Sequence, residues 1–387
     1  MRQLLLFTLG ILFFSACQNT SKPKEPDMES TYELLVGTYS KKEGHVDGKA
    51  EGIHQITLNA NGSLSGGEAV ATDIINPSYL TLSQDGQFMY AASETGPDVD
   101  SVGYVHAYAK QASGEWKFLN RQSSHSFAPC YVATHPSGKY LSVANYVGGT
   151  IALYPIEEDG SLKQASTVFK VEGNSNHPRQ DSSHPHATVF SPDGEYLFVP
   201  DLGANEVWVF KVNVESGTLA IQLTSKFPLQ KEAGPRHLVI HPNGQFAYLA
   251  NELDNTVVAY DISDISAITR LQTLSTLPDQ VTIESYVADI HLRPNGQHLY
   301  VSNRGHNSLA HFEVDATTGM LTAKNYHDTK GDFPRNFVIH PDGSKLYVAN
   351  QNTDNIVGYN IRESGDLSQF TTINMPTPVC LKFRSLK

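Results

Sequence analysis

Side chains that can act as bases or bind anions recur at two matched positions of a phrase that repeats along the chain. Eight residues before the turn glycine of each repeat, the chain carries Ser78, Cys130, His186, Arg236, Ala288 and Arg335. Eight residues after it, the chain carries Glu94, Tyr146, Leu202, Glu252, Arg304 and Gln351. Imidazole and carboxylate groups can serve as general bases, and arginines can hold an anion or stabilise a developing oxyanion. The set suits water attack on an activated ester, or proton abstraction beside a carboxylate.

The three arginines are the sharpest feature of this set. Near one axis they would repel one another unless an anion lay between them. Surface charges around a solvated hole are the alternative interpretation. His184 lies two residues before His186 and therefore on the same face of a strand, whereas His237 points away from Arg236 in an ideal strand.

The elements that must position these residues are short strands. Each repeat has a short apolar run, a turn ending in glycine, and an aromatic-rich run ending near asparagine. The turn glycines, spaced 47 to 56 residues apart, are Gly86, Gly138, Gly194, Gly244, Gly296 and Gly343. A third strand such as 256–260 and a further stretch complete each unit. Four short strands in about 50 residues, repeated, predict the blade of a β-propeller.

Six glycines account for six blades, and the seventh must be assembled from the two ends of the chain. Tyr32–Tyr39 and Thr377–Phe383 both have strand patterns, and closing the ring with them removes an exposed sheet edge. We therefore predict an all-β, seven-bladed propeller of four-stranded antiparallel blades, forming one domain over residues 32–387. If the phrase forms the two innermost strands of each blade, both matched positions converge on one mouth of the central channel.

Other recurring residues belong to the scaffold. The histidines before the turn glycines lie in the hairpin turns, and the asparagines that end the phrase, Asn303 among them, fit backbone-bonding positions. The polar segment 171–183 lengthens one interval to 56 residues. It can form a lid over the channel that carries Arg179 and Gln180, or a plain surface loop. Cys130 and Cys380 can pair or remain buried thiols.

Composition excludes several classes of protein. A net charge of −12 without a basic run argues against nucleic-acid binding, and three cysteines cannot build a disulfide framework. No strained serine elbow and no His/Cys cluster at zinc spacing occur. Calcium-dependent propeller esterases need inward carboxylates and amides, whereas these positions are rich in arginine. We expect no metal and no cofactor at the site.

The N-terminus has the pattern of an export signal. Arg2 precedes an apolar run, 4–14, which is too short to span a bilayer. Ser15-Ala16-Cys17 resembles a bacterial lipoprotein signal, so residues 1–17 are expected to direct cleavage before Cys17 and its lipidation. An ordinary secretory signal is the alternative. Residues 18–31 fit a flexible tether, and the mature protein is expected in the periplasm or on the outer membrane, attached to a membrane only through lipid.

Five phrases resemble the seven-bladed propeller lactonase family, which includes propeller-type 6-phosphogluconolactonases and a related carboxy-muconate lactonising enzyme. The phrases, with Arg179-Gln180 upstream, are His184-Pro185-His186, Gly234-Pro235-Arg236-His237, Ala250-Asn251-Glu252, Ser302-Asn303-Arg304-Gly305 and Phe333-Pro334-Arg335-Asn336. By this resemblance His186 or His184, Arg236, Glu252 and Arg304 match the positions proposed for catalysis and carboxylate binding. The resemblance also covers residues that we expect to contact the substrate, namely His184, His237, Arg335, Arg179 and Asn303.

The sequence therefore predicts a sugar lactonase of the 6-phosphogluconolactonase type, acting on an anionic small molecule without metal. Water would be activated by His186 or Glu252, with the choice left open, and Arg236 and Arg304 would stabilise the oxyanion. A cycloisomerase acting on a muconate-type carboxylate is one alternative. A non-catalytic, surface-anchored propeller that binds a ligand is another.

Overall fold

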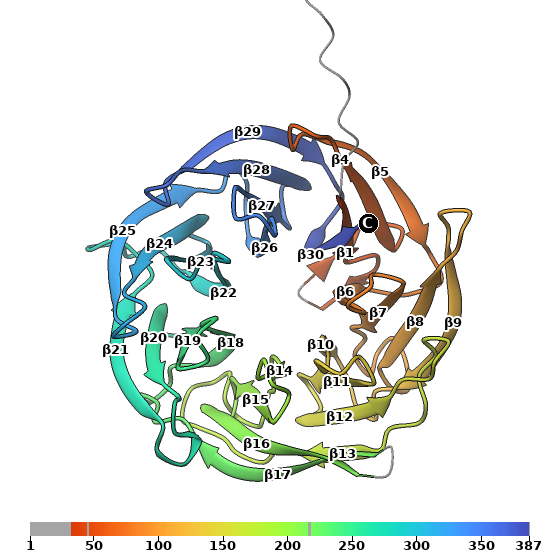
Figure 1. The fold of residues 1–387 in the computed structure, drawn as a ribbon, viewed down its shortest axis with the longest axis horizontal. Helices are drawn as coiled ribbons and strands as arrows, with labels where there is room; N and C mark the ends of the chain where they lie inside the picture. Colours follow the sequence, from red (N-terminus) through yellow and green to blue (C-terminus); the bar gives the residue numbers. More distant parts are fainter. Residues whose placement is uncertain (1–31, 45, 216–217, 387) are drawn as a thin grey trace, which may run out of the picture.

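The computed structural model describes residues 32–44, 46–215 and 218–386. The expected signal peptide with Cys17 and the tether 18–31 lie outside the described residues. Seven four-stranded antiparallel sheets surround a common axis (Figure 1), which confirms the predicted propeller. A short 3-10 turn, η1 (Ile265–Ala267), is the only helical element in the described ranges. None of their helices is long and apolar enough to cross a membrane.

Six of the seven blades run in chain order from the axis outward (Figure 1). The first of these blades consists of β6 (Pro77–Leu82), β7 (Phe88–Ser93), β8 (Tyr104–Lys110) and β9 (Trp116–Ser123). The second consists of β10 (Pro129–Thr134), β11 (Tyr140–Asn145), β12 (Thr150–Pro155) and β13 (Thr167–Lys170). The next two are β14 (Val189–Phe190), β15 (Tyr196–Asp201), β16 (Glu206–Glu215), β17 (Thr218–Lys226), and β18 (Pro235–Ile240), β19 (Phe246–Asn251), β20 (Thr256–Asp261), β21 (Thr269–Ser275). The last two are β22 (Tyr286–Leu292), β23 (His298–Arg304), β24 (Ser308–Val314), β25 (Leu321–Asp328), and β26 (Pro334–Ile339), β27 (Lys345–Asn350), β28 (Asn355–Ile361), β29 (Leu367–Asn374).

The seventh blade joins the two ends of the chain, as predicted. Its order is β30 (Pro378–Ser385), β1 (Tyr32–Thr38), β4 (Ile53–Leu58) and β5 (Leu64–Ala71). The C-terminal strand β30 pairs antiparallel with β1, for example Leu34 opposite Phe383. A small hairpin of β2 (Lys42–Glu43) and β3 (Val46–Asp47) follows β1. Pairing the two ends leaves no free edge at the axis where the ring would otherwise open.

Burial follows from the stacking of one blade on the next. The second strands, such as β11 and β19, are buried along their whole length because both of their faces pack against neighbouring blades. This explains their nearly continuous apolar sequence. The outermost strands, such as β25, are mostly exposed.

The residues assigned to the scaffold do hold backbone. Asn145, Asn303 and Asn350 each donate a side-chain N–H to the backbone carbonyl that follows the outermost strand of the preceding blade, at 2.8 to 3.0 Å. In the hairpin before Gly138, His135 Nε2 lies 3.0 Å from the Gly194 carbonyl of the next blade. Cys130 and Cys380 are both buried and free, so they do not pair.

Candidate active site

The two matched positions meet at the axis, where they line two connected layers. An outer cavity of about 430 Å³ is lined by Glu94, Cys130, Tyr146, Arg179, His186, Glu252, Tyr286, Arg304, Phe333 and Arg335. Beneath it lies a space of about 10 Å³ lined by Ser78, Tyr79, Glu94, Cys130, His186, Arg236, His237, Arg335, Asn336 and Val379. Residues at the position before the turn glycine form the floor, from which Cys130, His186 and Arg335 also reach the outer cavity, and residues at the position after it form the wall. The outer volume is within the ~300–1,000 Å³ of small-molecule sites.

Local irregularities in the innermost strands aim the floor residues at the axis. In five blades, the residue eight positions before the turn glycine lies on the first strand but has no partner on the second strand. Arg236 is skipped in this way between Pro235 and His237. Such bulges turn a side chain out of the regular alternation, and they are common next to active sites. As a result Arg236 and His237 do not point apart, as an ideal strand would require, and Arg236 Nη1 lies 3.1 Å from His237 Nε2.

Glu252 is the centre of the charge network. Its side chain is 2% exposed, and its carboxylate contacts Arg179 Nη1 at 2.7 Å, Arg304 Nη2 at 2.9 Å and Arg236 Nε at 3.0 Å. Burial alone would raise the pKa of this carboxyl, but the three guanidinium groups outweigh burial and lower it to about 2. Glu252 is therefore ionised at neutral pH and is the anion that lets the arginines lie together.

The arginines differ in how many of their donors the protein uses. Arg236 is 2% exposed and uses Nε on Glu252 and Nη1 on the Ala288 carbonyl at 2.6 Å. Arg304 Nη2 also donates to the Val287 carbonyl at 2.9 Å, but its buried Nε has no acceptor.

Arg335 has most of its donors free. Its guanidinium lies above the ring of Tyr39, 5.4 Å from the ring centroid, and its nearest carboxylate is Glu94, 3.9 Å away. Tyr39 holds that carboxylate through a hydrogen bond of 3.0 Å. Arg335 makes no hydrogen bond to the described residues and lines both layers of the cavity. An arginine with free donors in a partly buried cavity is suited to bind a phosphate or carboxylate.

His186 is the one imidazole that lines both layers. Its Nδ1 lies 3.8 Å from Cys130 Sγ, and its ring meets Tyr146 edge to face at 5.2 Å. Nε2 makes no hydrogen bond to the described residues. Burial, together with Arg236 and His237, lowers the pKa of His186 well below its ordinary 6.5, so the ring is neutral at pH 7 and can accept a proton.

A second buried carboxylate supports the floor from below. Asp289 Oδ1 lies 2.7 Å from His237 Nδ1, and Oδ2 lies 2.9 Å from His291 Nε2 and also accepts from Asn336. Because His237 Nδ1 donates to Asp289, its Nε2 is left as the acceptor facing Arg236. Asp289 thereby fixes the orientation of an imidazole that in turn positions Arg236.

The segment 171–183 does reach over the channel. Arg179 leaves it to pair with Glu252, to donate to Tyr146 Oη at 3.2 Å, and to line the outer cavity. The base of the segment is held by Gln180, which is fully buried and donates to the Leu202 carbonyl at 2.6 Å. Of the two interpretations left open, the lid agrees with these contacts.

Two residues expected to touch the substrate line neither layer. His184 stacks on the Tyr146 ring at 4.6 Å and contacts its carbonyl at 2.8 Å. Asn303 is fully buried, with its amide nitrogen on the Thr276 carbonyl at 2.8 Å and on Ser308 Oγ at 3.1 Å. His237 lines only the inner layer. The remaining predicted residues, His186, Arg236, Glu252, Arg304, Arg335 and Arg179, do come together.

Sequence reasoning missed several residues of the site, and three of them bear on its charges. Tyr286 and Phe333 line the outer cavity, where Arg179 and Arg304 lie above their rings at 5.6 and 5.2 Å. Asp289 sits directly after one of the matched positions. That adjacency was the only available signal, because a bulge brings Asp289 beneath His237.

Known proteins share this architecture over nearly the whole chain. A 6-phosphogluconolactonase of Bacillus subtilis is 33% identical over 352 residues, which cover 90% of this chain and 97% of that protein. The solved structure of a periplasmic gluconolactonase of Pseudomonas aeruginosa has a TM-score of 0.86 at 32% identity, covering 92% of this chain and 99% of that one. A putative 6-phosphogluconolactonase of Bacteroides fragilis has a TM-score of 0.83 at 34% identity, covering 93% and 100%. The family described as "Lactonase, 7-bladed beta-propeller" matches residues 33–383, and the chain belongs to this family.

Proposed function

We propose that this protein hydrolyses a sugar lactone that carries an anionic group, with 6-phosphogluconolactone as the expected substrate and the aldonic acid as product. The observation that carries the proposal is that one cavity is lined both by a neutral His186 and by Arg335, most of whose donors are free. The relatives named above support the lactone. The charges in the cavity support the anionic group.

The outer cavity has an excess of positive charge even after its internal pairs are formed. Three arginines, Arg179, Arg304 and Arg335, face two carboxylates, Glu94 and Glu252, among its lining residues. In a partly buried site such an excess attracts an anion more strongly than it would in water. Arg335 and Arg179 are therefore assigned to the phosphate. Arg179 is 40% exposed and can adjust as substrate enters.

In the proposed mechanism His186 Nε2 takes a proton from a water molecule as that water attacks the lactone carbonyl carbon. The carbonyl oxygen gains negative charge, which Arg304 at the outer cavity and Arg236 at the inner space stabilise. The ring C–O bond then breaks, and the leaving oxygen receives the proton from the imidazolium of His186. Removing one oxyanion donor typically costs about 10²–10³ in rate.

We assign Glu252 to positioning and the proton transfer to His186. A carboxylate with a pKa of about 2, held by three arginines, is a weak base at neutral pH. His186 becomes a stronger base when the anionic substrate arrives, because the new negative charge offsets the arginines that lower its pKa.

We also propose that the protein is exported and attached to a membrane by lipid on Cys17. The support is the pattern of residues 1–17 and the periplasmic location in the name of the Pseudomonas aeruginosa structure. Replacing Cys17 by alanine should then move the protein from the membrane fraction to the soluble fraction of cells.

The test of activity is proton release by residues 18–387 with fresh 6-phosphogluconolactone and, separately, gluconolactone, with spontaneous hydrolysis subtracted. We expect His186→Ala to lose about 10²–10⁴ of the rate, and Arg335→Ala to raise KM chiefly for the phosphorylated lactone. The exposed His125 and Arg270 provide matched controls, and H125A and R270A should behave as wild type. No acceleration of either lactone would refute the proposal, and equal KM changes for both lactones in R335A would refute the phosphate assignment.

A further inference from the structure

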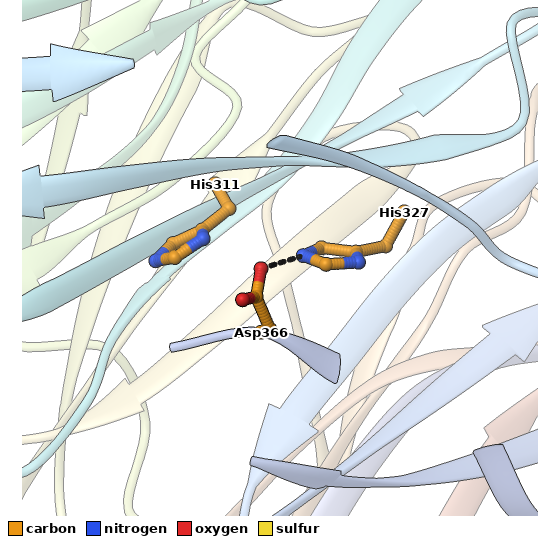
Figure 2. Close-up of side chains that lie close together, drawn as sticks. All are labelled: His311, His327 and Asp366. Atoms are coloured by element: carbon orange, nitrogen blue, oxygen red, sulfur yellow. Dashed lines mark ion pairs between the residues drawn. The ribbon is translucent and has the colours of Figure 1, made fainter. Parts of the chain in front are cut away.

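A cluster of metal-binding side chains lies far out on the propeller, away from the channel. His311 is on β24, His327 is on β25, and Asp366 lies in the turn that precedes β29 of the next blade (Figure 2). One ligand atom from each residue lies within 4.8 Å of the other two. No lining residue of the channel cavities takes part.

The hydrogen bonds around His311 leave one of its nitrogens without a partner. His298 Nε2 lies 3.1 Å from the Glu363 carbonyl and must donate to it, so His298 Nδ1 carries a lone pair. His311 Nε2, 3.0 Å from that nitrogen, therefore carries the proton. The remaining lone pair is on His311 Nδ1, a buried atom with no hydrogen-bond partner, in a residue that is 1% exposed. A buried acceptor left unpaired is unfavourable, and a bound cation would relieve it.

The other two ligands face the same point. His327 Nε2 is likewise buried without a hydrogen bond and lies 3.9 Å from Asp366 Oδ1, the contact drawn in Figure 2. Asp366 is oriented by Ser364 Oγ, 2.9 Å from Oδ2, and by Asn325 Nδ2. The carboxylate keeps lone pairs free, since each of its oxygens can accept more than one bond.

Neighbouring residues hold the ring of His311 in one orientation, as the residues around the ligands do in known metal sites. Tyr300 stacks on it with centroids 4.9 Å apart and planes 16° from parallel. Gly365, with φ +80°, lies against the His298–His311 pair so closely that a Cβ there would collide with both rings. A histidine ligand whose second nitrogen donates to a fixed acceptor is the usual arrangement at zinc.

We propose that His311 Nδ1, His327 Nε2 and Asp366 Oδ1 bind one Zn²⁺ ion, which links the blade of β22–β25 to the blade of β26–β29. Two imidazoles and a carboxylate form a common zinc ligand set, and a water molecule completes the tetrahedron. The adjoining cavity of about 350 Å³, which Asp366 and His298 help to line, gives that water and the ion a route. Bonds of about 2.0–2.2 Å bring ligand atoms to roughly 3.4 Å from one another, so the side chains must move inward slightly.

The proposed role is to stabilise the fold, with water in the fourth position because three of the described side chains reach the ion. Neighbouring blades are joined chiefly by side-chain packing, so an ion held by both restrains their separation and stabilises the folded chain. Binding to the folded state alone raises Tm as the free zinc concentration exceeds Kd. The three ligand residues are far apart in the sequence, and for that reason they form no local zinc-binding motif.

The test is calorimetric titration of untagged, EDTA-treated and dialysed protein with ZnCl₂, together with Tm at each zinc concentration. We expect one ion per chain, a rise in Tm, and visible absorption of tetrahedral Co²⁺ when cobalt replaces zinc. His327→Ala and the size-conserving Asp366→Asn should each lose about 100-fold or more in affinity, and His298→Ala about 10–100-fold. His340→Ala is the matched control, because His340 pairs with Asp342 at 2.7 Å without a third ligand, and it should bind zinc as wild type.

Circular dichroism verifies that each variant is folded before titration. The proposal is overturned if the wild type takes up no zinc, or if H327A and D366N, both folded, bind it as tightly as H340A. Neither result bears on lactone hydrolysis in the channel, so this proposal and the proposed function fail independently.

Discussion

Replacing Glu252 by glutamine removes one negative charge from the centre of three arginines and changes almost nothing else in size. The structure sets the expected cost. The pKa of Glu252 falls from 4.5 to about 2 on folding, and about 1.36 kcal/mol for each pH unit makes the ionised carboxylate worth roughly 3 kcal/mol to the fold. Breaking a buried ion pair by removing one partner costs a similar ~3–5 kcal/mol. The pKa shift and the ion-pair estimate give similar free energies because both describe the same change. In E252Q the nearly buried Arg236 and Arg304 lose their counter-ion.

This free energy converts into a measurable temperature. About 355 folded residues at about 2.1 cal/mol/K each give an unfolding entropy near 0.75 kcal/mol/K. A loss of roughly 3 kcal/mol therefore lowers Tm by about 4 °C at neutral pH. Glu252 has a lower pKa in the folded chain, so its contribution is complete above about pH 4.5 and is lost as the pH falls toward 2. The gap in Tm between wild type and E252Q should narrow over that range.

Differential scanning calorimetry at pH 7 and at steps down to pH 3 measures both effects. The matched control is Glu157→Gln, which breaks an exposed pair with Lys163 at 3.0 Å and should cost less than about 1 kcal/mol. An E252Q variant with wild-type Tm would refute the account of Glu252 as the counter-ion of the arginines. Loss of activity in E252Q with unchanged Tm would instead move the proton transfer from His186 to Glu252.

Three further substitutions separate support from substrate contact. Asp289→Asn should lower Tm most above about pH 3.8 and less in acid. The reason is that the hydrogen-bonded neighbours His291 and His237 outweigh burial and hold the pKa of Asp289 well below 3.8. Calorimetry across this pH range measures the effect, and a decrease in Tm that does not depend on pH would contradict it. Arg179→Ala should raise KM for the phosphorylated lactone about tenfold in steady-state assays, and an unchanged KM would place the lid outside substrate binding. Asn303→Ala should reduce stability by about 1–3 kcal/mol in urea unfolding with KM unchanged, whereas a raised KM would restore it as a substrate ligand.

The fold could be predicted because its signals are local and repeated. Each blade contains the same glycine turn between two apolar runs, so six copies of one pattern supported a single interpretation. The seventh blade followed from an energetic requirement, since a ring with unpaired edges at both ends invites aggregation. The pairing of β1 with β30 meets that requirement.

The site could be located but not resolved in detail from the sequence. Counting eight residues to either side of a glycine found the residues of the floor and the wall, because their blades are equivalent. The same counting could not reveal the bulges, which depend on how the first strand pairs with the second. For that reason the sequence predicted that His237 points away from Arg236, and it did not predict the role of Asp289, which holds His237.

The arginines of the channel are a second case in which the sequence pattern located the residues but did not predict their contacts. Arginines gathered near one axis do require an anion, and from the sequence alone that requirement predicted an anionic ligand. In the structure the requirement is met mainly from within, because Glu252 contacts Arg179, Arg236 and Arg304. The case for an anionic substrate therefore rests chiefly on the one arginine that Glu252 does not contact, with the exposed Arg179 as its second donor. Arg335 keeps most of its donors free in the outer cavity, so a phosphate bound there gains hydrogen bonds without displacing an internal hydrogen bond. A phosphate bound at Arg236 would have to compete with Glu252.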